Sequence, residues 1–318
     1  MNQIDSQVIL ATGELCAFND LKVGMMLLDE FSQPRRLQAL SCRHVPAYEI
    51  RPMKGPSFFL GFDQTLVAQR GRDPVVLPME AIVRQPKSFQ TSLTLAKTTW
   101  DFPDKPLPLD PYLLGLLLGD GCFRGGQPCL TTPDPEIVNA VFSMAMMRGW
   151  PLRVVQSVGN LSNAYMFQNT PTVSLKTILQ HLKLWGCTSK EKFIPHEYKT
   201  ASWENRWKLL AGMIDTDGYK RWKSYEIFTA SARLAEDIAQ LARGLGCEVR
   251  CTMNRQKYHR LYLSGDFREC PLRVTRKQIH TEPSKLNLSF TVHEAGLQDV
   301  FYLGIESFLM SDGTVRRG

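Results

Sequence analysis

Features that would direct this chain to a membrane or to the secretory route are absent from its sequence. No apolar run approaches the roughly 18 residues that a membrane-spanning helix needs, the longest candidate being Leu113 to Leu118. The start of the chain, Met1 to Asp5, lacks the basic and apolar segments of a signal sequence. We therefore expect a soluble, intracellular protein, nuclear in a eukaryote and otherwise cytoplasmic, with no membrane partner.

Paired cysteine motifs are also missing. The closest of the eight cysteines, Cys247 and Cys251, do not form a C-x-x-C pair. Neither a disulfide framework nor a structural zinc site is therefore indicated. We interpret this closest pair as ordinary buried thiols.

The length of 318 residues, 43% of them hydrophobic, is enough for about two domains with substantial cores. The net charge of +7 is concentrated in the middle of the chain. Residues 101–280 contain 24 Lys and Arg against 17 Asp and Glu, whereas the two flanks together contain 14 of each. A basic segment of this size is typical of a polyanion-binding protein, although charge alone also fits a solvated surface.

This basic segment contains an internal repeat at an offset of 97 residues. Pro111 to Gly121 aligns with Lys208 to Gly218, and the register continues to Gly149 and Gly246. Each copy predicts a helix that ends at Asp-Gly, then strands, then a second helix capped by Asp134 or Ser231. The pattern indicates two related units of helices and antiparallel strands, hence a pseudo-twofold α+β molecule.

Small residues recur along both repeated helices. Gly115 and Gly119 are four residues apart in the first, as are Gly212 and Thr216 in the second, so each helix has one stripe of small side chains. If the helices pack along these stripes, the aspartates at their ends, Asp120 and Asp217, emerge side by side.

Two adjacent carboxylates repel unless a cation lies between them, and oxygen-rich acidic sites suit Mg²⁺. Such an ion can activate water and stabilise the leaving oxygen of a phosphodiester. A single Asp-Gly pair more often marks an ordinary turn after a buried helix. Its repetition in register, inside the basic segment, favours the catalytic interpretation.

The two stretches resemble the paired motifs of the LAGLIDADG homing endonucleases. Leu210 to Gly218 is a close match, whereas the first copy has Leu118 where the motif usually has its earlier acid. The resemblance implies a monomeric, site-specific double-strand DNA endonuclease that acts on a long asymmetric site with Mg²⁺, or with Mn²⁺ as a substitute. It also implies a shared metal site at Asp120 and Asp217 with their neighbours Gly119 and Thr216.

Catalytic lysines follow from the same resemblance. Lys192-Phe193-Ile194-Pro195 is similar to the Lys-x-Ile-Pro block of intein endonucleases, whose lysine assists cleavage. For the second copy we expect Lys257, with Arg255 as the competing candidate.

DNA contacts are expected from strand residues, because alternate side chains on one face of a sheet can reach bases and phosphates. The candidates are Arg124, Arg153, Gln156, Lys220, Arg221, Lys223, Arg250, Arg255 and Arg260.

Both flanks are rich in short strand-like runs and resemble the Hint (protein-splicing) domain of inteins. The residues of its chemistry differ: Met1 stands at the nucleophile position, Gln64 at that of the activating histidine, and Arg317 and Gly318 at those of the terminal His-Asn pair. We expect a Hint-like domain without splicing activity.

The predicted architecture is an αββαββα LAGLIDADG domain at 101–280, with repeats at about 108–195 and 205–280. It is inserted in an all-β Hint-like domain formed by residues 1–100 and 281–318. A non-cleaving nucleic-acid binder, such as a maturase or transcription regulator of the same fold, is the main alternative function. An autoprocessing Hint protein is a weaker one.

Overall fold

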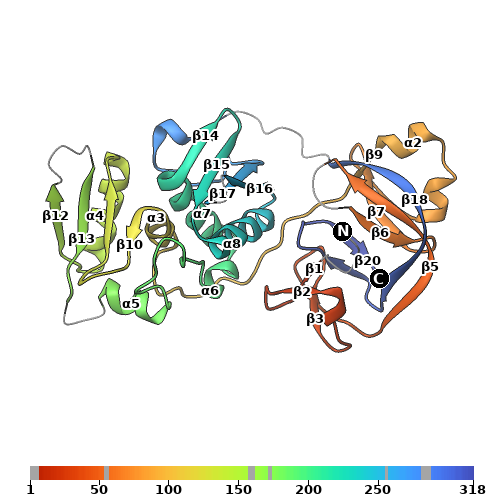
Figure 1. Cartoon of the computed structure of the whole chain (residues 1–318), viewed down its shortest axis with the longest axis horizontal. Coiled ribbons are helices and arrows are strands. Elements are labelled where there is room, and N and C mark those ends of the chain that lie inside the picture. Colours follow the sequence, from red (N-terminus) through yellow and green to blue (C-terminus); the bar gives the residue numbers. More distant parts are fainter. Residues whose placement is uncertain (1–6, 54–56, 157–161, 171–173, 255–256, 281–287) are drawn as a thin grey trace. The chain divides into compact units, whose positions relative to one another are not determined.

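A computed structural model describes residues 7–53, 57–156, 162–170, 174–254, 257–280 and 288–318. The chain divides into two compact units (Figure 1). Unit 1 contains residues 1–100 and 285–318, and unit 2 contains residues 101–284. Among the described residues, no helix is both long and apolar enough to cross a membrane.

Unit 2 contains two copies of one arrangement of helices and antiparallel strands (Figure 1). The elements of the first copy are α3 (Pro111–Asp120), β10 (Gly121–Cys122), β11 (Cys129–Thr132), α4 (Pro135–Met147), β12 (Leu152–Gln156), β13 (Asn163–Phe167) and α5 (Leu175–His181). Those of the second copy are α7 (Trp203–Asp217), β14 (Gly218–Arg221), β15 (Ser224–Thr229), α8 (Ala232–Gly244), β16 (Glu248–Asn254) and β17 (Tyr258–Ser264).

The strand order is equivalent in the two sheets, β10-β11-β13-β12 and β14-β15-β17-β16. Every strand pair in them is antiparallel, so the predicted mixed α+β unit is confirmed. A short helix, α6 (His196–Lys199), precedes the second copy. In the described part of the second copy, the counterpart of α5 is only a 3-10 turn at Thr275–Lys277.

The two second helices begin differently. The Ser231 hydroxyl accepts a hydrogen bond from the Leu234 amide at 3.1 Å, so the predicted cap of α8 is confirmed. Asp134 precedes α4 but makes no capping hydrogen bond. Its carboxylate accepts instead from the Arg276 guanidinium, with Nη2 and Oδ2 3.0 Å apart. The Asp134 carboxylate thus binds a guanidinium from the second copy and not the amides at the start of its own helix.

Helices α3 and α7 are in backbone contact along the predicted stripes. A Cβ atom built on Gly115 would lie 2.2 Å from the Leu209 carbonyl oxygen, and one on Gly212 would lie 2.3 Å from that of Tyr112. A Cβ on Gly119 would lie 2.0 Å from the Thr216 hydroxyl. The apolar sides of both helices belong to one hydrophobic core that spans the two copies.

Unit 1 is dominated by strands. Its largest sheet has the order β6-β5-β18-β9-β7-β8, formed by Phe58–Gly61, Leu40–Pro52, Leu288–Leu303, Leu93–Leu95, Thr65–Arg70 and Asp73–Pro78. Three two-stranded sheets complete it: β1-β2 (Gln7–Ile9, Leu15–Ala17), β3-β4 (Met26–Leu28, Pro34–Arg36) and β19-β20 (Ser307–Leu309, Val315–Arg317). The helices α1 (Met79–Val83) and α2 (Lys87–Ser92) are short. The long antiparallel pairing of β5 with β18 joins the two separated parts of the chain.

Substitution of Gly115 or Gly212 by Ala should lower the free energy of unfolding of the chain by about 1–3 kcal/mol, because the added methyl group meets backbone atoms that cannot yield without separating the helices. Chemical denaturation monitored by tryptophan fluorescence measures this loss. The matched control is Gly126→Ala, where an added Cβ has nothing within 4 Å. Equal stability of all three variants would contradict the close packing.

Candidate functional site

The helix packing places the two repeated aspartates together. Asp120 and Asp217 are the last residues of α3 and α7. The Asp217 carboxylate reaches α3, since its Oδ2 lies 3.4 Å from the position of a Cβ built on Gly119. The site therefore has one carboxylate from each copy.

Both carboxylates lie in an environment that favours their neutral form. Burial raises the pKa of Asp217 to about 6, and the neighbouring charge of Asp120 adds to this shift. Burial also raises the pKa of Asp120. The positive charges of Lys192 and Lys277 oppose both shifts. Two acids and two bases therefore act on one another at the ends of the paired helices.

Lys192 binds the carboxyl-terminal end of α3. Its buried Nζ donates to the carbonyl oxygens of Leu118, Gly119 and Gly121 at 2.8–2.9 Å. Burial lowers the pKa of Lys192 to about 8, although the Asp217 and Asp120 carboxylates oppose the change. The ammonium group satisfies carbonyls that have no partner within the helix and complements the negative end of the helix dipole.

Lys277 binds the end of α7 in the same manner. Its Nζ donates to the carbonyl oxygens of Ile214, Asp215 and Thr216 at 2.8–3.1 Å. Burial lowers the pKa of Lys277 as well. The lysine at the helix end of the second copy is thus Lys277, which was not predicted from the sequence. The short sequence Lys277-Gln278-Ile279, which repeats the Lys-x-Ile of Lys192-Phe193-Ile194, is the signal that could have found it.

The candidate named from the sequence, Lys257, lies elsewhere. It is exposed at the turn between β16 and β17, where its ammonium lies 5.9 Å from the centre of the Tyr258 ring. Its charge is not among those that shift the pKa of Asp120 or Asp217. The competing candidate Arg255 lies outside the described residues.

A buried carboxylate fixes the segment that carries Lys277. Asp215, which has no exposed surface, accepts from the Tyr112 hydroxyl at 2.7 Å. It also accepts from the backbone amides of Arg273 at 2.8 Å and Val274 at 3.3 Å. Since these amides lie three and four residues before Lys277, Asp215 is a positioning residue for that lysine.

Lys192, which binds the end of α3, is held by other residues. Helix α3 has Leu118 at the position where α7 has Asp215. The Ser231 hydroxyl donates to the Lys192 carbonyl oxygen at 2.7 Å. Asp237 accepts from the Ile194 amide at 2.8 Å. Both are residues of the second copy, so the lysine of the first copy depends on contacts with the second.

The donor set suits a hard divalent cation. Carboxylates of Asp120 and Asp217 are adjacent to the carbonyls of Gly119 and Thr216, and all of these are oxygen donors of the kind that Mg²⁺ prefers. The two carbonyls already accept from Lys192 and Lys277, but each carbonyl oxygen has two lone pairs. No cluster of three or more His, Cys, Asp and Glu side chains occurs in the described part of the chain. An ion here would therefore complete its coordination with water and substrate oxygens.

Arginines lie on equivalent positions of the two sheets. Arg153 on β12 and Arg250 on β16 are exposed, and they are related by the 97-residue offset of the repeat. Arg250 pairs in register with Tyr262, which pairs with Glu226 on the same face of the second sheet. By the alternation of side chains along a strand, Arg221 and Arg260 belong to that face too.

Glu226 ties two of these arginines together. This carboxylate is only 2% exposed, and it accepts from Arg260 Nη2 at 2.6 Å. Its other oxygen lies 3.1 Å from Arg221 Nε. The Arg260 guanidinium also stacks 4.4 Å from the centre of the Tyr262 ring. Both arginines were predicted from the sequence, whereas Glu226 was not.

The other DNA-binding candidates predicted from the sequence and described by the structure do not lie on the sheet faces that carry these arginines. Gln156 and Lys220 point to the opposite faces of their sheets, and Lys220 Nζ donates to the Gln278 carbonyl oxygen at 2.6 Å. Lys223 is in the exposed β14–β15 turn, 5.3 Å from the centre of the Trp222 ring. Arg124 is exposed in the segment between β10 and β11.

Unit 1 contains Gln64 where the resemblance expects a histidine. Its side chain is 9% exposed and holds two strands together, since Nε2 donates to the Phe301 carbonyl oxygen at 2.7 Å and Oε1 accepts from the Gly61 amide at 3.0 Å.

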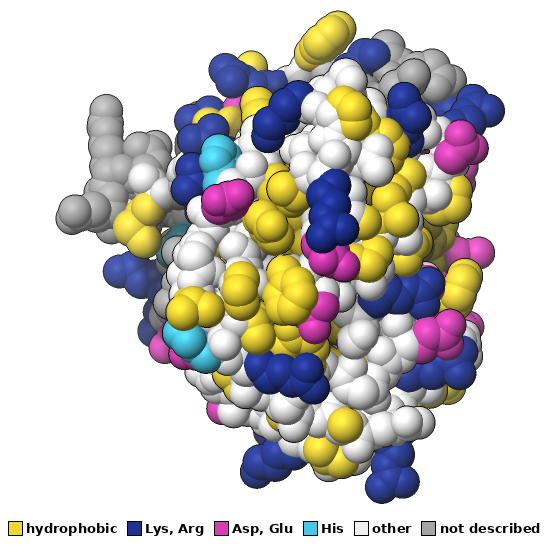
Figure 2. Space-filling model, turned by 90° about the vertical axis from the view of Figure 1, so that its right-hand side faces the viewer, with side chains coloured by type: hydrophobic (Ala, Val, Ile, Leu, Met, Phe, Trp, Pro, Cys, Tyr) yellow, Lys and Arg dark blue, Asp and Glu magenta, His cyan; other side chains and the backbone are white. Residues whose placement is uncertain are grey.

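On the face in Figure 2, basic side chains are dispersed among apolar ones and do not form one continuous patch.

Comparisons with known proteins are consistent with the sequence motifs. The homing endonuclease family pattern matches residues 193–278. The replicative DNA helicase DnaB of Mycobacterium intracellulare is 29% identical over 157 residues, which are 49% of this chain but only 22% of the helicase.

Solved structures show distant similarity. Mesophilic variants of the homing endonuclease I-DmoI are 15% identical, with a TM-score of 0.37 over 49% of this chain and 87% of theirs. I-DmoI in complex with DNA and Ca is 14% identical, with a TM-score of 0.37 over 49% of this chain and 82% of its own. The N-terminal LAGLIDADG domain of WhiA is 8% identical, with a TM-score of 0.35 over 49% of this chain and 74% of that domain. From the family match and the two motifs, we conclude that the chain contains a homing endonuclease domain of the LAGLIDADG type.

Proposed function

We propose that this protein is a site-specific endonuclease that hydrolyses both strands of double-stranded DNA at a long asymmetric site. The observation that carries the proposal is the meeting of Asp120 and Asp217 at the ends of two helices in backbone contact, with a lysine bound to each helix end. One chain supplies both halves of this site, so we propose that it acts as a monomer.

Each group has a distinct role in the proposed reaction. Asp120 and Asp217 would hold Mg²⁺, with Mn²⁺ as a substitute, together with the carbonyls of Gly119 and Thr216. The ion, when bound, would supply Lewis-acid stabilisation of the oxygens at the scissile phosphate. Lys192 and Lys277 would hold the carboxylates in position and stabilise the added negative charge of the transition state. Asp215 acts through Lys277.

The proposed DNA-contacting residues on the sheet faces are four arginines, namely Arg153, Arg221, Arg250 and Arg260. Their exposed or partly exposed guanidinium groups can bind phosphates or the edges of guanine. In the second sheet, Glu226 would fix the direction of Arg221 and Arg260. The complexes of I-DmoI with DNA and Ca, and with DNA and Mn, are compatible with this interpretation.

An intein origin accounts for the partial match to a helicase and for the strand-rich unit 1. An endonuclease-bearing intein inserted in the helicase would produce similarity over only 22% of its length. We propose that unit 1 is Hint-like and no longer splices. The side-chain amide of Gln64 does not titrate near neutral pH and so cannot act as the base for acyl transfer. The segments outside residues 101–280 contain as many Lys and Arg as Asp and Glu, 14 of each, which favours a minor part of unit 1 in DNA binding.

Both aspartates should be essential. The variants Asp120→Asn and Asp217→Asn are expected to lose cleavage of a large, sequence-diverse DNA library in Mg²⁺, measured by sequencing new ends, while they retain salt-sensitive binding. Recurrent ends at one long motif with the wild-type protein would support the nuclease. Binding without cleavage by the wild-type protein would instead favour the alternative, a non-cleaving binder of the same fold.

Lys277 and Lys257 distinguish the two assignments of the second lysine. Lys277→Met should lower the cleavage rate by about 10²-fold or more, as loss of a positioned charge does, whereas Lys257→Met should leave it nearly unchanged. Asp215→Asn should lower the rate through Lys277, with normal DNA affinity. Single-turnover rates at saturating enzyme measure these effects. A larger loss in Lys257→Met than in Lys277→Met would refute the assignment.

Cation binding should strengthen as the pH rises through about 6, because Asp217 binds the ion only after it loses its proton. In the metal-free protein, the contribution of Asp217 to the free energy of unfolding should instead fall as the pH rises. Since the folded-state pKa of Asp217 is raised, its stabilising contribution is full below about pH 4 and is lost as the pH rises through about 6, a change of about 3 kcal/mol. Calorimetric titration with Mg²⁺ and denaturation in EDTA measure the two trends. Asp217→Asn should weaken both trends and leave the part that comes from Asp120, whose pKa is also raised. An unchanged pH dependence in that variant would contradict the prediction.

A further inference from the structure

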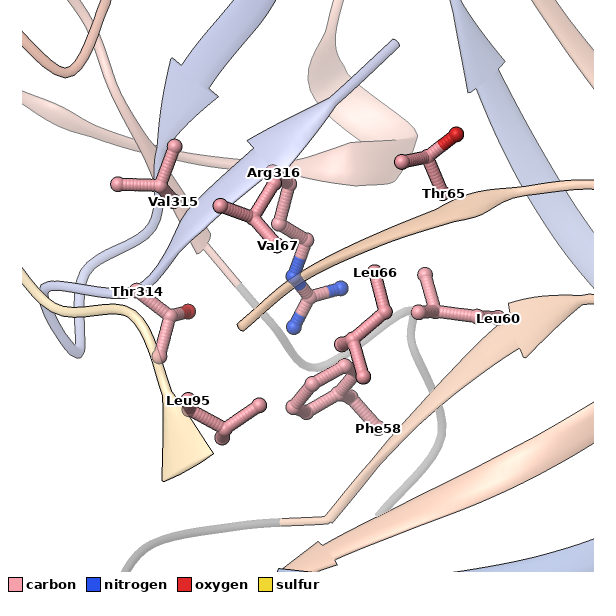
Figure 3. A pocket seen from close by; sticks show the side chains of 9 residues that line it. All are labelled: Phe58, Leu60, Thr65, Leu66, Val67, Leu95, Thr314, Val315 and Arg316. Carbon is pink, nitrogen blue, oxygen red and sulfur yellow. The ribbon is translucent and has the colours of Figure 1, made fainter. Parts of the chain in front are cut away.

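Unit 1 encloses a small cavity around a buried arginine, separate from the carboxylate site. The cavity lies between β20 and the strands β6, β7 and β9, and the Arg316 side chain extends into it (Figure 3). Leucines such as Leu66 and Leu95 form much of its lining, while Thr65 and Thr314 contribute hydroxyl groups.

The Arg316 guanidinium lacks acceptors for its hydrogens. The residue is only 5% exposed, and its Nε and Nη1 atoms have no hydrogen-bonding partner among the described residues. The Phe58 ring covers one face of the guanidinium, with its centre 3.7 Å from Cζ. A ring can stabilise the charge from above, but it does not accept the in-plane hydrogens at those two nitrogens.

Charge compensation from the protein is also incomplete. Burial lowers the pKa of Arg316 to about 10, so the group still carries its charge near neutral pH. Asp312 is the acid whose charge acts on it. That carboxylate already accepts from the Thr314 amide at 2.8 Å and from its hydroxyl at 2.6 Å. It forms no ion pair within 4.0 Å of Arg316 in the described part of the chain. A buried charge with free donors in an apolar surrounding indicates an additional ligand.

We propose that this cavity binds one small monovalent anion of the halide class, held by Nε or Nη1 of Arg316. The free space of about 10 Å³ for a water-sized sphere limits the ligand to a single small species and is too small for a nucleotide or a sugar phosphate. A water molecule could accept the hydrogens, but it would leave the positive charge uncompensated. The bound ion would link β20 to the large sheet, and this role is independent of the proposed nuclease activity.

Hydrogen exchange of the full chain tests the proposal. At equal ionic strength and neutral pH, the peptide that contains Val315–Arg317 should exchange several-fold more slowly in sodium chloride or bromide than in sodium gluconate, whose anion is too large for the cavity. The salt effect should vanish in Arg316→Met. The matched control is Arg70→Met, which removes an exposed arginine 5.2 Å from the centre of the Phe89 ring in the same unit and should preserve the effect.

Crystals of the wild-type protein grown in bromide give a second readout that does not depend on the folding of a variant. An anomalous peak within hydrogen-bond distance of Nε or Nη1 would support the site. Equal exchange in all three salts, or density for water alone with no anomalous peak at saturating bromide, would overturn it.

Discussion

The arrangement of unit 2 depends on one contact, the approach of the α3 and α7 backbones at Gly115 and Gly212. Nearer the ends of the two helices, the hydroxyl of Thr216 on α7 occupies the space that a side chain at Gly119 on α3 would need. Because the helices meet at this distance, the aspartates at their ends share one small volume. A larger residue at either glycine would move the carboxylates apart and end their electrostatic coupling.

The charges brought together by this contact are balanced within the protein. Lys192 and Lys277 bind carbonyls at the negative ends of the helix dipoles, and they oppose the repulsion between the carboxylates. The segment of each lysine contacts the second helix of the other copy: Ser231 binds the Lys192 carbonyl, and Asp134 binds Arg276 next to Lys277. The segment that carries the lysine of each copy is therefore bound in part by a residue of the other copy.

Buried charges elsewhere in the chain show two different solutions. Glu226 lies under a basic sheet face and is compensated by Arg221 and Arg260, so its burial restricts the directions of both arginines. Arg316 is buried beside Phe58 with only a distant acid, and its uncompensated donors distinguish it from those paired groups.

The sequence by itself determined the two copies, the helices that end at Asp120 and Asp217, and the stripes that join them. These features are recorded locally, because a helix places residues four apart on one face. Only the tertiary structure identified Lys277, since 60 residues separate it from Asp217 whereas 72 separate Lys192 from Asp120. Its acceptors are backbone carbonyls, which leave no trace in residue identity. The pairing of Glu226 with arginines on neighbouring strands was likewise decided by strand register, which sequence spacing does not specify.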